Sequence, residues 1–465
     1  MKGLSMASKS KRAQMAPQRN LAKTFMYWAI AVLVVKLVII FNIQALPLNE
    51  TWGKDFLVGG IWPGSDAENY LAGYINLIKD GIFSTESILS YFPAGYPLII
   101  LFLSIFGKSW VLITLSILQS LIFSFAAYYF AVQLSRTRLK KFSYLVFVLI
   151  IFNPTLSLTS IIIGYESLTA SGYLIVFALI MKDFVEKNDK NFSKYLIASS
   201  LIFGLMTFMQ PRLIISGLII NSLWLLVRKG VKTGSLLLII SLAITLFFPV
   251  TLIYRNYKAN GFNAISTNLG ATMNIGAGDK ATGGFTDKDY GVPCDTTGDV
   301  AQKDNQTVKC VLNWYLNNPV KSVELFYNKT LYFWSPWSGP EGNGTMARNP
   351  WLKINPIQNI IKTKEGYTLI FSGFGKLISW LWLLGGIAIL LYGYLILWRQ
   401  KSLERFIGSI AMIAIGSNWL ISLISIGDHR FRVPIMGMSL FLQAVGIKTL
   451  LNGGKAPMVD GPSLR

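Results

Sequence analysis

The sequence has 465 residues, of which 52% are hydrophobic and only 14% are charged, and its formal net charge is +21. A soluble globular chain carries about 25% charged residues, so these values argue against a soluble domain. The basic residues lie in short loops between long apolar blocks. We therefore interpret the charge as a sign of membrane topology and of anionic lipid neighbours, and we exclude nucleic acid as a partner.

The first part of the chain predicts a basic tail followed by a membrane-embedded bundle. Residues 1–23 are expected to form a cytoplasmic tail, and residues 24–254 a transmembrane bundle. The bundle includes a first outer loop at 47–109, in which the amphipathic stretch 67–83 and the short apolar piece 97–107 are expected to lie in the membrane interface.

Ten apolar blocks are expected to cross the membrane as helices, because helices satisfy their own backbone polar groups. They are 24–46, 110–135, 142–163, 165–181, 195–210, 212–227, 235–254, 367–398, 407–426 and 433–451. With this count, the basic clusters at 136–141, 228–232 and 399–405 all fall on the cytoplasmic side, as the positive-inside rule requires. The prediction is an all-α polytopic membrane protein.

The same parity places a long polar segment outside the membrane. Residues 255–366 are expected to form a small extracytoplasmic domain, followed by C-terminal transmembrane helices at 367–451 and a cytoplasmic tail at 452–465. Both cysteines, Cys294 and Cys310, lie in the outer segment, where an oxidising compartment would favour a disulfide. Two free thiols are the alternative.

Two acidic residues fall on the outer side next to predicted helices. Asp66 precedes the stretch AENYLAGY and could act as a general base for a hydroxyl acceptor, although a helix N-cap is the competing interpretation. Glu166, in GYESLTA at 164–170, falls at the outer start of a spanning helix, where an acid also complements the helix dipole.

Four arginines are predicted at the outer ends of different helices, although basic residues normally concentrate inside. They are Arg212, Arg255, Arg430 and Arg432. Guanidinium groups bind phosphate with two parallel hydrogen bonds, so these residues are candidates for a phosphate site; ordinary contact with lipid headgroups is the alternative. His429, the single histidine, argues against a histidine-based zinc site.

Taken together, six motifs resemble those of membrane-embedded GT-C glycosyltransferases. The resemblance is to family 39 and its bacterial relatives, which include protein O-mannosyltransferases, lipid A aminoarabinose transferases and transferases of lipopolysaccharide or wall glycans. The motifs are SDAENY at 65–70, YFPAGYP at 91–97, GYESL at 164–168, MQPRL at 209–213, the segment 255–284, and GDHRFRVPI at 427–435. The chain departs from the family pattern at Ala94, at Tyr165, and in the order of Pro211 and Arg212.

The resemblance implies a GT-C fold with interfacial helices in the first outer loop, and inverting transfer of a sugar from a polyprenyl-phosphate donor to a lipid, glycan or protein acceptor. Asp66 would be the general base, Glu166 a second site residue, and the four arginines ligands of the donor phosphate. On the same resemblance, substrate-binding residues are expected at Glu68, Tyr91, Tyr96 and Asn268. The enzyme is expected in the inner (plasma) membrane, with its active site facing the periplasm.

Three points stay open at this stage. Some members of the wider class use a divalent cation, and Asp66 and Glu166 could hold Mg²⁺ or Mn²⁺, although two carboxylates make a thin site. A polytopic transporter or lipid-linked-sugar flippase is the alternative function; internal repeats would favour it, and none is evident. A polymer ligase with a large outer loop is a third interpretation.

Overall fold

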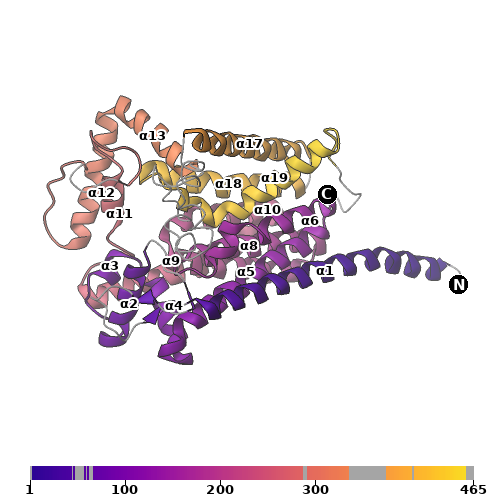
Figure 1. The fold of residues 1–465 in the computed structure, drawn as a ribbon, viewed down its shortest axis with the longest axis horizontal. Helices are drawn as coiled ribbons and strands as arrows, with labels where there is room; N and C mark the ends of the chain where they lie inside the picture. The colour runs from indigo at the N-terminus through magenta and orange to yellow at the C-terminus, as the bar shows by residue number, and fades with distance from the viewer. Residues whose placement is uncertain are drawn as a thin grey trace.

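In the computed structural model, the chain is a bundle of long helices with smaller elements gathered at one end (Figure 1). The structure describes residues 3–43, 46–47, 57–58, 60–61, 66–285, 291–334, 373–400 and 403–456. Parts of the predictions for the first-loop motif (62–65), the outer segment (286–290 and 335–366) and the C-terminal tail (457–465) lie outside these ranges.

Eight helical stretches within these ranges are long and apolar enough to cross a membrane. They belong to α1 (Gly3–Asn42), α5 (Val111–Ser135), α8 (Glu166–Glu186), α9 (Asp189–Met209), α10 (Ile214–Asn260), α18 (Leu403–Ile424) and α19 (Met436–Leu451). Helix α10 supplies two of them, because Gly230 adopts φ 71° and breaks it into two spans. The predicted class, an all-α multi-pass membrane protein, is confirmed.

The two other predicted crossings are helical, but neither contains a described helical stretch that is both long and apolar enough to cross a membrane. Block 142–163 contains α6 (Ser143–Ile151) and α7 (Pro154–Thr159), preceded by the short helix η4 (Lys140–Phe142). The break between α6 and α7 follows from Asn153-Pro154: proline cannot donate a backbone hydrogen bond, and the Asn153 side chain caps α7 by accepting from Leu156 N at 3.0 Å. Block 367–398 contains α17 (Gly373–Trp398), whose described apolar part begins at Leu383.

The bundle core combines apolar packing with buried hydrogen bonds between helices. Phe130 and Phe441 meet edge to face with ring centroids 5.9 Å apart. Ser199 donates to Asn221 at 2.6 Å, while Ser200 and Ser241 hydroxyls lie 2.7 Å apart. Because lipid tails are as apolar as leucine, such close packing and interhelical hydrogen bonds hold transmembrane helices together.

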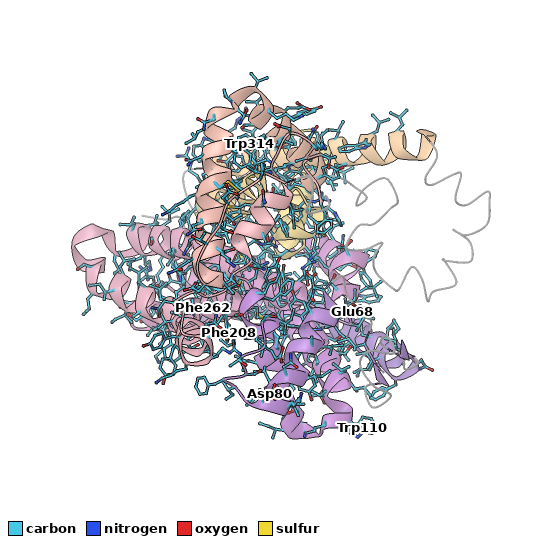
Figure 2. All side chains as sticks on the ribbon, turned by 90° about the vertical axis from the view of Figure 1, so that its left-hand side faces the viewer. Glu68, Asp80, Trp110, Phe208, Phe262 and Trp314 are labelled. Carbon is cyan, nitrogen blue, oxygen red and sulfur yellow. A yellow bond between two sulfur atoms is a disulfide. The ribbon has the colours of Figure 1, made fainter. Side chains whose placement is uncertain are left out.

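The non-spanning elements cover the end of the bundle opposite the N-terminal part of α1 (Figure 1). Between α1 and α5 lie β1 (Leu46–Pro47), β2 (Leu57–Val58), α2 (Ala67–Asp80), α3 (Ile88–Tyr91), α4 (Gly95–Leu103), η2 (Ser104–Phe106) and η3 (Lys108–Trp110). After α10 come α11 (Leu269–Ile275), α12 (Val300–Asn317) and α13 (Pro319–Trp334). Seen end-on in Figure 2, Glu68 and Asp80 of α2 lie below Trp314 of α12.

Arg255, near the end of α10, joins that helix to the first loop. Its side chain is 3% exposed and donates hydrogen bonds to the carbonyls of Ile82 at 3.1 Å and Leu89 at 3.3 Å, and also to the carbonyl of Ser84. A further bond, of 2.8 Å, joins it to the Asn256 side chain. The end of α10 is therefore fastened to the first loop by a guanidinium group whose three nitrogen atoms all donate to protein acceptors.

The disulfide between Cys294 and Cys310 closes a loop onto α12, with the two Cα atoms 6.0 Å apart. Helix α12 begins at a capping box in which Asp299 accepts from Gln302 N at 2.8 Å and the Gln302 side chain accepts from Asp299 N at 3.1 Å.

We expect the double substitution Cys294→Ser/Cys310→Ser to destabilise the outer segment by about 3 kcal/mol, because the open chain regains loop entropy. Hydrogen exchange of peptides from 291–317 should become faster, and reduction of the wild type should reproduce the effect. Peptides from α8 serve as the control and should not change. Equal exchange in the oxidised, reduced and substituted proteins would contradict the expectation.

Candidate functional site

The turn before α8 is held by a buried hydrogen-bond network that starts in the first loop. The Tyr96 hydroxyl, on the fully buried side of α4, accepts from Gly164 N at 2.9 Å and donates to Gln119 Oε1 at 3.0 Å. Gln119 of α5 in turn donates to the carbonyls of Ser160 at 3.2 Å and Ile162 at 3.0 Å. The network fixes the backbone from which Glu166 projects. Tyr96 therefore supports the position of Glu166 from a buried place behind the site.

Asp66 occupies the N-cap position of α2, but its side chain makes no capping hydrogen bond. Its Oδ2 atom instead accepts a hydrogen bond from Nη2 of Arg430. The sequence left two interpretations of Asp66 open, a helix N-cap and a general base. The geometry does not support the N-cap, because the carboxylate points toward an arginine that lies 364 positions away in the chain.

Arg430 joins Asp66 to the second predicted acid. Its Nε atom donates to Glu166 Oε1 at 2.7 Å, and Nη2 reaches the hydroxyl of Tyr165 at 3.4 Å. The three charged side chains are partly shielded, with 24% of the Asp66 side chain exposed, 13% of Arg430 and 9% of Glu166. Asp66 is thus the carboxylate that a molecule from outside reaches most easily, and the described residues engage only its Oδ2 atom.

Arg430 is presented by a short 3-10 helix, η7 (His429–Ile435), which follows the end of α18. Asp428 begins η7: its Oδ1 atom accepts from Arg430 N at 2.8 Å and lies 3.0 Å from His429 Nδ1. Burial acts to raise the pKa of Asp428, but the hydrogen bond and charge of His429, together with Arg430, lower it to about 2. Asp428 therefore remains an anion that fixes the backbone of Arg430 at any physiological pH.

Aromatic side chains lie beside the carboxylates of Asp66 and Glu166. The Tyr165 hydroxyl accepts from Gln210 Nε2 at 2.7 Å, and its ring lies 6.3 Å from that of Tyr70, edge to face. Burial, and then the charge of Asp66, raise the pKa of Tyr70 well above its ordinary value, so its hydroxyl stays neutral. A neutral aromatic wall lowers the local dielectric constant and strengthens the charge interactions beside it.

Arg212 lies next to this group and is engaged differently. In η5 (Pro211–Leu213), its guanidinium stacks over the ring of Phe431 at 3.5 Å from the centroid. It interacts electrostatically with Arg430, Tyr165 and Glu166. Its Nε and Nη2 atoms are buried and have no hydrogen-bond partner among the described residues. Stacking orients the guanidinium plane while leaving donors for an anion.

The other predicted site residues are spread around the end of the bundle. Arg432 lies over Trp334, with its guanidinium carbon 5.7 Å from the ring centroid, and Arg255 is committed to the first loop as described above. Glu68 is exposed on α2, and Tyr91 packs edge to face on Phe92 at 5.1 Å. Asn268 stands at the N-cap of α11 and accepts from the Ser266 hydroxyl at 3.1 Å.

The structure therefore brings together Asp66, Glu166 and Arg430 in direct contact, with Arg212 beside them. It also adds residues that sequence reasoning did not select as site residues: Tyr70, Tyr165, Gln210, Asp428 and Phe431. Each of them lies in or next to one of the quoted motifs. Their position in or next to the motifs was the available signal in the sequence. A motif does not show which of its side chains point toward the site.

The carboxylates do not form a metal-ligand set of their own. No group of three or more His, Cys, Asp or Glu side chains suited to a metal ion occurs within the described residues. Asp66 and Glu166 are both paired with Arg430.

We expect Gly164→Ala to weaken the pair between Glu166 and Arg430. A Cβ atom at this position would overlap Glu166 Oε2, so the carboxylate must move away from the guanidinium. Disturbing a buried charge-assisted bond of this kind costs about 1–3 kcal/mol. The thermal unfolding midpoint in detergent should fall relative to Gly385→Ala, which adds a Cβ atom where nothing lies within 4 Å. Equal midpoints would contradict the expectation.

Comparison with known proteins gives only distant likenesses. No protein-family model matches the chain, and no curated protein matches its sequence. Among solved structures, it is similar to the Archaeoglobus fulgidus oligosaccharyltransferase in a complex with Zn and sulfate, at 15% identity and a TM-score of 0.42 over 91% of this chain and 49% of the other. The same enzyme tethered to an acceptor peptide containing the NVT sequon gives 13% identity and a TM-score of 0.43 over 92% and 50%. The chain thus spans about half the length of the structures it matches.

Proposed function

We propose that this protein is a membrane glycosyltransferase of the GT-C class that transfers a sugar from a polyprenyl-phosphate donor to a hydroxyl-bearing acceptor at the extracytoplasmic face. The single observation that carries the proposal is the contact of Asp66 and Glu166 with Arg430 at one end of a multi-pass helical bundle. We propose by the positive-inside rule that this end faces outward, because the basic clusters of the sequence follow or precede the opposite ends of the spanning helices.

The reaction we propose is a single displacement with inversion at the anomeric carbon. Asp66 takes the proton of the acceptor hydroxyl while the acceptor oxygen bonds to the anomeric carbon. The bond from that carbon to the phosphate oxygen breaks, and the polyprenyl phosphate leaves with the electron pair. A phosphate leaves without protonation, so one general base suffices, whereas glycosidases need two carboxylates. The unengaged Oδ1 atom and the greater exposure of Asp66 support its choice over Glu166.

We assign the donor phosphate chiefly to Arg212. Arg430 is already shared between two carboxylates and Arg255 between backbone carbonyls, whereas Arg212 keeps two buried nitrogen atoms without a partner in the described part of the chain. Positive charge that is fixed before the reaction stabilises the negative charge developing on the leaving phosphate. Arg430 would orient Asp66 and Glu166, and Arg432, two positions further on, would stand at the rim of the phosphate site.

The acceptor is proposed to enter between the first loop and the outer segment. Glu68 of α2, Tyr91 of α3 and Asn268 at the N-cap of α11 belong to these two parts of the chain, and we keep them as candidates for acceptor contacts. The acceptor class stays a lipid, a glycan or a protein. The proposed step uses no divalent cation, because Asp66 and Glu166 are both paired with Arg430. Dependence on Mg²⁺ or Mn²⁺ remains a separate expectation, which chelation would test.

One observation favours the alternative of a transporter or flippase. Lys36 of α1 is 2% exposed, lies 4.2 Å from the centroid of Phe123, and its amine has no hydrogen-bond partner among the described residues. Charged groups inside membrane helices often mark transport paths. The proposed acid–arginine cluster lies elsewhere, at the end of the bundle, and this favours surface chemistry over transport.

Asp66→Asn should abolish sugar transfer while donor binding persists, because an amide cannot accept the acceptor proton. Loss of a general base costs about 10²–10⁴-fold in rate. Transfer from radiolabelled polyprenyl-phosphate sugars into membrane acceptors measures it, and a panel of donors in the same assay identifies the sugar. Asp80→Asn, on the last residue of the same helix, is the matched control. Near-normal turnover of Asp66→Asn would exclude this residue as the base.

Arg212→Lys should raise the KM for the donor about tenfold, which corresponds to about 1.4 kcal/mol of binding free energy. Lysine retains the charge but loses the planar group that stacks on Phe431 and presents two donors. The matched variant Arg255→Lys should lower thermal stability and leave the donor KM of the folded protein within about twofold. The opposite pattern, with donor KM raised only by Arg255→Lys, would assign the phosphate to Arg255.

A further inference from the structure

A lysine is buried where the outer segment meets the end of α18. Lys329 lies on the inner face of α13, together with Ser322, Leu325 and Phe333, and is 0% exposed. Its ammonium group uses three donors: one to the Tyr315 hydroxyl at 2.6 Å, one to the carbonyl of Leu423 at 2.9 Å, and one to the carbonyl of Ser425 at 2.5 Å. Two of these acceptors belong to the last turn of α18 and the residues just after it.

The backbone of Lys329 is also in close contact with the loop that follows α18. Gly427 N donates to the carbonyl of Gly283 at 2.8 Å. A Cβ atom on Gly427 would lie 2.5 Å from the carbonyl oxygen of Lys329 and 2.7 Å from its Cα. Only glycine permits this approach, so α13 rests directly on the loop that runs from α18 into Asp428 and Arg430.

A buried ammonium group at position 329 is not explained by its contribution to folding stability alone. Burial lowers the pKa of Lys329 to about 7, which reflects the cost of removing an ammonium group from water. No salt bridge to Lys329 occurs within the described residues, so the cost is offset only by hydroxyl and carbonyl oxygens. An apolar side chain at such a site is often neutral or stabilising. What the ammonium group adds is direction, because its three bonds fix where α18 ends.

We propose that Lys329 is a positioning residue for the transfer reaction, which holds the end of α18 so that Arg430 meets Asp66 and Glu166. This inference rests on the proposed function for its kinetic consequence, but not for its structural one. Helix α13 packs against both α18 and η7, and Thr330 accepts from Trp419 of α18 at 3.2 Å. The outer segment, where the acceptor is proposed to bind, is thereby joined rigidly to the arginine at the reaction centre.

The test compares Lys329→Met with the control Lys321→Met. Lys321 is a partly exposed lysine of the same helix, and its one ion pair within the described residues is with Glu324. In Lys329→Met, hydrogen exchange of peptides covering 423–432 should rise at least tenfold, because the carbonyls of Leu423 and Ser425 are no longer held by the ammonium group. The bonds of Gly427 N to Gly283 and of Arg430 N to Asp428 should then open more often. The kcat per folded molecule should fall about tenfold, or about 1.4 kcal/mol of activation free energy, with donor KM within twofold. Lys321→Met should match the wild type in all three measurements.

A second pair of variants guards against a folding defect in Lys329→Met. Gly427→Ala should give the same rise in exchange and fall in kcat by pushing α13 off the loop, whereas Gly416→Ala, on α18 with open space around it, should not. Adding Lys329→Met to Arg430→Lys should lower kcat by less than twofold, because the positioned group is already altered.

Unchanged exchange at 423–432 in Lys329→Met would overturn the proposal, as would a lower unfolding midpoint with unaltered kcat in the folded fraction. A wild-type protein without any transfer activity would sink the proposed function instead, and the exchange measurement would still decide whether Lys329 holds this loop.

Discussion

The arrangement at the end of the bundle that carries the short loop helices depends on one guanidinium group shared between two carboxylates. Arg430 contacts Asp66 and Glu166, which come from the first loop and from the start of α8. Burying any one of these charges without an opposite charge would cost free energy. Removing one member of such a set leaves the others without compensation. The three segments are therefore constrained to one relative position, and the surrounding turns can be understood as the means of reaching it.

Those turns are places where the sequence interrupts regular helix. Pro211 separates α9 from the next span and puts Arg212 on a short 3-10 turn, and Asp428 starts another such turn that carries Arg430. Gly164 leaves room for the Glu166 carboxylate to fold back beside its own backbone. A continuous transmembrane helix spreads its side chains around its axis. Interrupted ends can instead direct several charged groups toward one point.

Much of this organisation can be predicted from the sequence, because bilayer thickness and the positive-inside rule are strong constraints. Length and apolarity indicate the spanning helices, and the block at 142–163 carries its own interruption, Asn153-Pro154, which splits it into α6 and α7. Motif resemblance selected Asp66, Glu166 and Arg430. It could not separate Arg430 from Arg255, since both are arginines at outer helix ends, and only the partners of each side chain distinguish them. Lys329 has no distinguishing sequence signal except its inner position on an amphipathic helix.

Arg255 and Lys329 are buried cations that lie away from the cluster of Asp66, Glu166 and Arg430 and make a different kind of contact. Each places a cation against backbone carbonyls of another element: the first loop for Arg255, and the end of α18 for Lys329. Carbonyls at helix ends and in loops lack helical partners, and a cation that gathers several of them fixes the direction in which the chain leaves. Loops that must hold catalytic groups within a fraction of an ångström need such anchoring. Two kinds of buried arginine are thus distinguished at this end of the described chain: Arg255 spends its donors on carbonyls of the first loop, whereas Arg212 keeps two nitrogen atoms without a hydrogen-bond partner among the described residues.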